Sequence, residues 1–263
     1  MSSASIIEKM ETVILKEKKI FLINNFLTSS ESETFIEMMN EKNTETIGVH
    51  ANSYRFCERS VIKMEDLAKK LWERIKLIME EQKVMDVSIE AQHKFSGHWD
   101  AIGLNETFRL VRYKKGGHFD AHCDSYFERN DAERSFWTLN IYLNTVYSKC
   151  GGATRFLDSD ISNPEVQPKM GSALLFFQPN ILHEGVELID GKKYLMRSDV
   201  MFRRREGSAV LLSNVQEEAL ELYRRAEELE ISQDQDRAWR LYAKSFKLWP
   251  ELETHSQREG DFT

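Results

Sequence analysis

The distribution of apolar residues changes twice along the chain and divides it into three regions. The first region contains two predicted helices. Thr34–Glu41 follows a run of capping residues that starts at Thr28, and Glu65–Gln82 repeats apolar side chains at helical spacing. The short apolar run Lys19–Asn24 before them is typical of a buried strand. Helices therefore come before the part of the chain where strands dominate.

From about residue 107 the pattern is that of short strands separated by turns. The turns are marked by glycine, at Gly116-Gly117, Gly151-Gly152 and Asp190-Gly191. The predicted strands are Thr107–Tyr113, Ser135–Asn144, Ala153–Leu157, Ser172–Gln178 and Tyr194–Arg203. Helices followed by many strands predict an α+β domain with a jelly-roll or barrel core.

After Arg205 the pattern returns to helical spacing. One apolar stripe runs from Val215 to Leu229 and a second from Ala238 to Phe246, where Pro250 ends it. This pair resembles a single tetratricopeptide unit of two antiparallel helices. The sequence therefore predicts a domain over residues 1–206 and a helical hairpin over 207–263. The hairpin is expected to be a structural cap, with recruitment of a protein partner through residues 214–249 as the alternative.

Composition limits the classes of protein that the chain can belong to. A hydrophobic share of 41% with 30% charged residues is that of a soluble globular protein. The net charge of −7 disfavours nucleic acid and anionic membranes as partners. The amino terminus alternates acids and lysines where a signal peptide needs an apolar core, and no apolar run spans a membrane. Cys57, Cys123 and Cys150 are odd in number, so we expect reduced thiols in the cytosol or nucleus.

Three His-x-Asp pairs are candidate metal ligands. His98 follows a glycine in a segment without alternation and is read as loop, and His118 directly follows Gly116-Gly117, where a turn leaves its direction undefined. His122 lies further along the extended stretch, so its side chain and that of Asp124 are expected on one face while Cys123 points away. We rank His122 with Asp124 first and His118 with Asp120 second.

A further histidine, His183, supplies the third ligand of the expected site. Two imidazoles and a carboxylate form a facial triad that leaves three positions of an octahedral Fe(II) open. Those positions are where a co-substrate and dioxygen can bind.

Several motifs in order resemble the prolyl-4-hydroxylase-like 2-oxoglutarate/Fe(II) oxygenases, over roughly Lys19 to Arg204. The motifs are Phe108–Asp124, Leu139–Asn144, Gly151–Phe156, Pro168–Phe176, His183-Glu184-Gly185 and Gly191–Val200. The resemblance implies a double-stranded β-helix over about 107–205, with iron held by His122, Asp124 and His183. It also selects His122 over His118.

The same resemblance implies where 2-oxoglutarate binds. Lys193 corresponds to the family's basic residue for the distal carboxylate, with Arg197, on the same strand face, as the alternative. Tyr113 and Tyr142 are expected to donate hydroxyl hydrogen bonds to the co-substrate, or else to be buried packing residues. Ascorbate joins Fe(II), 2-oxoglutarate and dioxygen among the expected cofactors.

The implied activity is hydroxylation of a C–H bond with release of succinate and CO2. A prolyl or other residue in a protein or peptide is the expected substrate, a small molecule is an alternative, and a non-catalytic adaptor is another. Arg59 is a candidate substrate contact, with a surface salt bridge as its alternative role. Tyr126 lies in Ser125–Arg134, which is expected to be a lid over the iron or a solvated connector.

Overall fold

The computed structural model describes residues 9–48, 53–89, 95–157, 164–178, 181–209, 212–231, 235–250 and 252. The chain divides into two compact units. The first comprises residues 1–86 and 100–203, and the second comprises residues 87–99 and 204–263. The sequence did not suggest that residues 87–99 belong with the C-terminal unit, and the division expected after residue 206 stays a prediction.

Two helices of the first unit form where the sequence predicts them. Helix α1 (Ser29–Glu41) begins earlier than the expected Thr34, because Thr28 and Glu31 form a reciprocal capping box. Helix α2 (Glu65–Glu81) buries one apolar face. Glu31 Oε1 also pairs with Arg74 Nη2 of α2 at 2.7 Å, and this contact is the main cause that lowers the pKa of Glu31 to about 2. The ion pair ties the two helices together.

The five strands predicted between residues 107 and 205 are confirmed with shifts of a few residues at their ends, and further short strands lie around them. The strands are β1 (Glu11–Lys16), β2 (Ile20–Asn24), β3 (Glu45–Ile47), β4 (Arg55–Lys63), β5 (Asp86–Ile89), β6 (Gly97–Leu104), β7 (Thr107–Tyr113), β8 (His118–His122), β9 (Glu128–Asn130), β10 (Glu133–Tyr142), β11 (Thr154–Phe156), β12 (Glu165–Val166), β13 (Ala173–Phe177), β14 (His183–Gly185) and β15 (Lys193–Arg204). A short 3₁₀ turn covers Ser148–Cys150.

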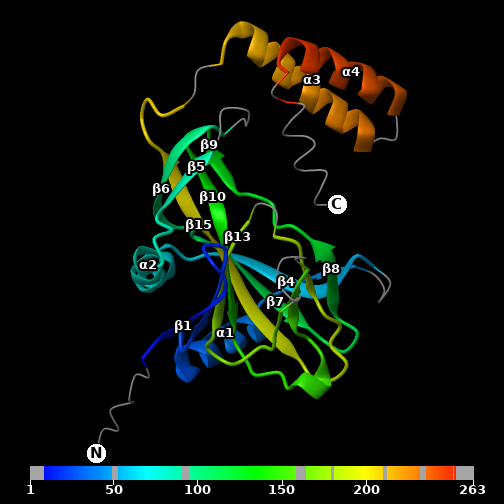
Figure 1. The fold of residues 1–263 in the computed structure, drawn as a ribbon. Coiled ribbons are helices and arrows are strands. Elements are labelled where there is room, and N and C mark those ends of the chain that lie inside the picture. The colour runs from blue at the N-terminus through cyan, green and yellow to red at the C-terminus, as the bar shows by residue number, and fades with distance from the viewer. Residues whose placement is uncertain are drawn as a thin grey trace, which may run out of the picture. The chain divides into compact units, whose positions relative to one another are not determined.

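These strands build a curled antiparallel sheet in which many paired strands are far apart in sequence (Figure 1). The strand order is β1-β2-β13-β10-β15-β7-β4-β8-β14-β11-β12. Strand β4 pairs with β7 in one layer and with β8 in the other, so it joins the major sheet to a minor sheet of β8, β14, β11 and β12. This is a double-stranded β-helix, and the predicted α+β jelly-roll class is confirmed.

The core of the β-helix is apolar and closely enclosed. Tyr142, Phe156, Leu174 and Phe176 are fully buried and belong to one cluster between the strands. Burial of large side chains from both layers stabilises the curled sheet, since removing apolar area from water is the main favourable term in folding. Polar side chains, in contrast, line the mouth of the β-helix.

Three segments differ from the sequence-based expectation. Tyr54–Arg59 stands where sequences of the family that the chain resembles often carry an Arg-containing loop. Here it lies largely in β4, because that stretch forms ladders with β7 and β8. His98 is in β6 and not in a loop, although its side chain is exposed. Ser125–Arg134, expected to be a lid or a solvated connector, contains β9 and the start of β10, which pair with each other.

The second unit contains the predicted helical hairpin. Helices α3 (Asn214–Ile231) and α4 (Gln235–Leu248) pack through a cluster of aromatic rings, in which Tyr223 and Tyr242 lie 5.2 Å apart between centroids. Ser213 and Gln216 cap α3 through reciprocal hydrogen bonds. Within the described part of the chain, no helix combines the length and the apolar character needed to cross a membrane.

Candidate metal and co-substrate site

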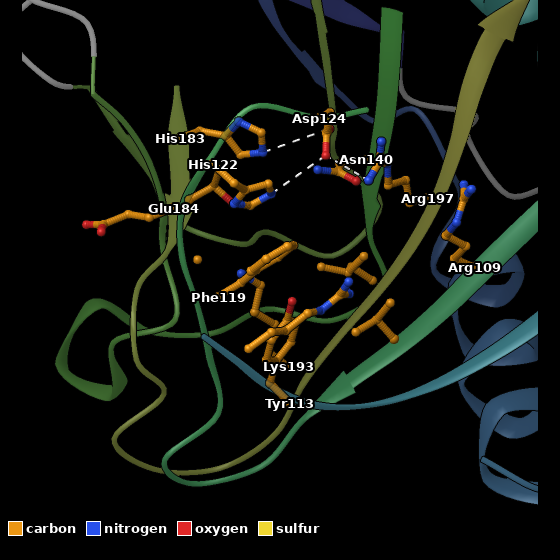
Figure 2. A pocket seen from close by; sticks show the side chains of 15 residues that line it. Arg109, Tyr113, Phe119, His122, Asp124, Asn140, His183, Glu184, Lys193 and Arg197 are labelled. Atoms are coloured by element: carbon orange, nitrogen blue, oxygen red, sulfur yellow. Dashed lines mark ion pairs between the residues drawn. The ribbon is translucent and has the colours of Figure 1, made fainter. Parts of the chain in front are cut away.

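The three predicted metal ligands converge at the mouth of the β-helix (Figure 2). His122 ends β8 and His183 begins β14, and the two are direct partners in the antiparallel ladder. Asp124 Oδ1 lies 3.6 Å from His122 Nε2, and Asp124 Oδ2 lies 3.9 Å from His183 Nε2. One ligand atom from each residue lies within 4.8 Å of the others.

Asp124 reaches the site by a different route from the one expected. It lies two residues beyond the end of β8, so strand alternation does not place it. Its carboxylate is instead fixed by Thr138 Oγ1, which donates to Oδ2 at 2.7 Å, and by Arg197 Nη1, 2.7 Å from Oδ1. Burial opposes ionisation of Asp124, but the charge of Arg197 and the hydrogen bond from Thr138 favour it, and the pKa of the carboxyl is held well below its usual range.

Both histidines present their Nε2 atoms to the site. His122 Nδ1 faces the carbonyl of Asp120 at 2.7 Å, and His183 Nδ1 faces the carbonyl of Ile181 at 2.9 Å. A carbonyl only accepts, so each Nδ1 carries a proton and each Nε2 is the ring atom left to face a metal. Burial lowers the pKa of His183 to about 4, which keeps that imidazole neutral near pH 7. Two imidazoles and one carboxylate are a suitable donor set for Fe(II).

The second-ranked pair, His118 and Asp120, is not part of this cluster. His118 is the first residue of β8, and its two ring nitrogens face the carbonyl oxygens of Gly116 and Ser53. The expectation that a turn leaves His118 without a fixed direction is wrong, because both sides of its ring are held.

Lys193 lies on the opposite wall of the same cavity. It begins β15, pairs with Tyr113 of β7, and is only 3% exposed. Its Nζ lies 5.4 Å from the ring centroid of Tyr113 and 5.7 Å from that of Tyr142, and no ion pair to it is found among the described residues. Burial alone lowers the pKa of Lys193 to about 7. A buried ammonium without a counter-charge is costly unless a ligand supplies one.

The two tyrosines differ in how free their hydroxyls are. Tyr142 donates to Thr154 Oγ1 at 2.7 Å, so its hydroxyl already has an acceptor. Tyr113 borders the cavity, and burial raises its pKa to about 12. Both phenols therefore stay protonated and can act as donors at neutral pH.

Arg197, the alternative partner for 2-oxoglutarate, is occupied by other groups. Besides Asp124 it lies near Asp199 Oδ1 and Thr138 Oγ1, each at 3.4 Å from Nη2. It borders the cavity on the side of the metal ligands, where it faces Asp124 (Figure 2). Arg197 is therefore placed to hold the carboxylate of Asp124, whereas Lys193 is the basic residue at the other end of the cavity.

The two candidate substrate contacts lie away from the cavity, which is about 50 Å³ in volume and is bordered by other residues of the described chain. Arg59 pairs with Glu45, with Nε 2.7 Å from Oε1, which matches the alternative role of a surface salt bridge. Tyr126 packs under Arg134, whose guanidinium carbon lies 4.0 Å from the ring centroid.

The cavity is bordered by residues that the sequence did not single out as ligands. Among them are Arg55, Arg109, Phe119, Asn140 and Glu184. Arg55 and Arg59 are both on β4, and only the strand pairing shows that its amino-terminal end reaches the site, since Arg55 is opposite Phe119 of β8. The aromatic and basic run Tyr54–Arg59 was the signal available in the sequence. It does not show which end of the run borders the cavity.

Comparisons with known proteins agree with this geometry. Residues 108–200 match the family model of the 2OG-Fe(II) oxygenase superfamily. A probable prolyl 4-hydroxylase 4 of Arabidopsis thaliana is 30% identical over 118 residues, which are 34% of this chain and 39% of that protein. The chain thus covers about two fifths of the curated relative.

Two solved structures share the fold. A viral collagen prolyl hydroxylase from Paramecium Bursaria Chlorella virus-1, in complex with 2OG, has a TM-score of 0.50 at 18% identity, covering 73% of this chain and 100% of that one. A prolyl-4-hydroxylase from Pseudomonas putida has a TM-score of 0.52 at 15% identity, covering 71% and 93%. The resemblance seen in the motifs is therefore confirmed: residues 108–200 match the superfamily model, and the chain shares the fold of the two solved structures.

Proposed function

We propose that this chain is an Fe(II)- and 2-oxoglutarate-dependent dioxygenase that hydroxylates a prolyl residue in a protein or peptide and releases succinate and CO2. The observation that carries the proposal is the cluster of His122, Asp124 and His183 facing a cavity with a buried lysine, Lys193, on its far side. The name of the curated relative supports prolyl as the target residue. Small-molecule hydroxylation is the alternative within the same chemistry.

In this proposal each group has a separate task. When bound, iron supplies the open positions at which 2-oxoglutarate and dioxygen react. His122, Asp124 and His183 would hold it through the atoms that already converge. Lys193 would take the distal carboxylate of 2-oxoglutarate in its charged form, and the hydroxyl of Tyr113 would donate to the same carboxylate. Val111 and Leu195 border the cavity between these ends and would exclude water.

An anaerobic titration tests the proposal. Fe(II) and 2-oxoglutarate are added to metal-free protein, and the weak visible absorption band of chelated 2-oxoglutarate is followed in the wild type and in two single variants, His122→Ala and His118→Ala. We expect the band in the wild type and in His118→Ala but not in His122→Ala. Its absence from the wild type would exclude the oxygenase and favour the adaptor alternative.

The same proposal covers the substrate, an auxiliary reductant and the compartment. The substrate is tested by screening proline-containing peptides by mass spectrometry for the gain of one oxygen atom. A hit only among small molecules would replace the peptide substrate by a small molecule. Ascorbate is proposed as an auxiliary reductant, which a comparison of turnover with and without it would test. The cytosol or nucleus is the proposed compartment, to be examined by imaging of the tagged protein.

A further inference from the structure

The ring of His118 is held between two carbonyl groups. Its Nδ1 lies 2.9 Å from the carbonyl oxygen of Gly116, and its Nε2 lies 2.7 Å from that of Ser53. A carbonyl oxygen has no proton to give, so both contacts are hydrogen bonds only when both ring nitrogens carry one. The geometry therefore fits an imidazolium and not either neutral tautomer.

The surroundings of His118 favour its charged form. Asp120 Oδ1, on the same strand, lies 3.7 Å from Nε2, and Glu187 adds a second negative charge from the chain after β14. From β4, the residue opposite His118 is the uncharged Phe56, and the guanidinium of the neighbouring Arg55 lies over the ring of Phe119, 4.4 Å from its centroid. The hydrogen bond to Gly116 is the largest cause that raises the pKa of His118, and it acts against burial.

The turn that supplies one of the two carbonyls is built for a close approach. Gly116 has a φ of +81°, and a Cβ on Gly117 would lie 2.7 Å from the carbonyl oxygen of Lys114. Both glycines are therefore needed for the backbone to turn directly before β8. This rigid turn is one anchor of the His118 ring.

The other anchor, Ser53, begins a segment that forms one wall of the metal site. The carbonyl of Tyr54 accepts from the amide of Asp120 at 2.9 Å, and the ring of Tyr54 lies 6.5 Å from that of His122 between centroids. The next residue, Arg55, pairs with Phe119 and borders the cavity. Holding Ser53 in place therefore also fixes the two side chains that follow it.

We propose that His118 is a positioning residue: as an imidazolium it fastens Ser53 to the Gly116 turn and so holds Tyr54 and Arg55 against the ligand-bearing strand β8. Loss of one ring proton leaves two carbonyl acceptors facing a single donor, and the Ser53 contact or the Gly116 contact is lost. Below the pKa of His118, Tyr54 and Arg55 are held against β8. Above that pKa, the segment that carries them is held by one contact fewer. The consequence for a peptide substrate rests on the proposed function, but the fastening itself does not.

Nuclear magnetic resonance on the full metal-free chain tests the fastening directly. The nitrogen-15 shifts of the His118 ring report its protonation, and the exchange rate of the Asp120 amide, corrected for the intrinsic effect of pH, reports whether Tyr54 stays paired with β8. In the wild type we expect both ring nitrogens to be protonated at neutral pH. We also expect Asp120 protection to fall by about tenfold, the effect of one hydrogen bond, as the ring titrates.

Two variants complete the experiment. His118→Gln is expected to give low Asp120 protection that does not depend on pH, while His98→Gln, which removes an exposed imidazole, behaves like the wild type. Amides of Leu110 and Leu139 in the central strands report that the fold is intact. A neutral His118 at neutral pH in the wild type, or unchanged Asp120 protection in a folded His118→Gln, would overturn the proposal.

A kinetic measurement extends the test to the proposed function. In a folded His118→Gln we expect a higher KM for the peptide and little change in kcat, since Tyr54 and Arg55 border the site without being metal ligands. Because the exchange experiment needs neither metal nor turnover, failure to find an activity and failure of the fastening are separate results.

Discussion

Arg197 and Asp124 form an ion pair, with Nη1 of the arginine 2.7 Å from Oδ1 of the aspartate. The second carboxylate oxygen is taken by Thr138, and Gln178 donates to both Thr138 and Asp199 behind it. The candidate metal carboxylate is thus held by a buried polar network that extends into the core. This arrangement explains why Arg197 is less available than Lys193 to a co-substrate.

We expect Arg197→Met to destabilise the metal-free protein by about 3–5 kcal/mol, because it leaves a buried carboxylate without its partner. The pKa of Asp124 is depressed in the folded state, so its contribution to stability is present above the unfolded pKa and is lost as the pH falls through the folded one. The effect of the substitution should therefore be larger at pH 7 than in strong acid.

Urea unfolding measures the effect, with Arg203→Met as the matched control. Arg203 pairs with Glu133 but its side chain is 61% exposed, so its loss should cost under about 1 kcal/mol. Equal costs for the two variants would contradict the importance given to the buried pair.

Lys193→Met should weaken 2-oxoglutarate binding by roughly tenfold to over a hundredfold, the range expected for a charge-assisted hydrogen bond. Binding of the metal alone should be unchanged, because Lys193 is not near the ligand atoms. A calorimetric titration of Mn²⁺ alone, followed by one of 2-oxoglutarate in the presence of Mn²⁺, measures both affinities, with the exposed neighbour Lys192→Met as control. An unchanged affinity would transfer the role to Arg197.

The same lysine predicts that co-substrate binding depends on pH. Burial lowers the pKa of Lys193 to about 7, so above that pH the metal-free protein carries mostly the neutral amine. A bound carboxylate raises that pKa again, and binding at pH 8 should take up a proton. Calorimetry in two buffers of different ionisation enthalpy counts the protons, and affinity should fall as the pH rises. Lys193→Arg, which stays charged, should show no uptake.

Removal of residues 213–263 should leave the visible band of chelated 2-oxoglutarate intact. The ligand cluster and Lys193 belong to the first unit, whereas the α3–α4 hairpin belongs to the second. If the hairpin recruits a partner, as the alternative reading of residues 214–249 has it, capture of that partner is lost while turnover continues. Loss of the band on deletion would show instead that the β-helix needs the hairpin to fold.

The sequence predicted most strongly what depends on local pattern. Helix α2 follows from apolar spacing, β7 and β15 from β-type runs bounded by glycine turns, and the choice of His122, Asp124 and His183, which the structure brings together, from the motifs around them. Long-range pairing was not predictable in this way. That Arg55 reaches the cavity follows only from the pairing of β4 with β8.

Two errors have the same origin. The direction of His118 depends on carbonyls contributed by a distant segment, and the orientation of Asp124 depends on Arg197 and Thr138 from other strands. Rules for side-chain direction along one strand contain no information about such partners. They rank candidate residues but do not say what holds each one in place.

The minor sheet of the β-helix is made of strands with two to five residues, far shorter than β10 or β15. It has few ladder hydrogen bonds of its own, and yet it carries both histidines of the candidate centre. A cation that binds only when β8 and β14 are paired would stabilise that pairing by mass action. The stability of the minor sheet would then report whether metal is bound. Amide exchange in the minor sheet would slow as metal occupancy rises, while exchange in the major sheet would not depend on metal.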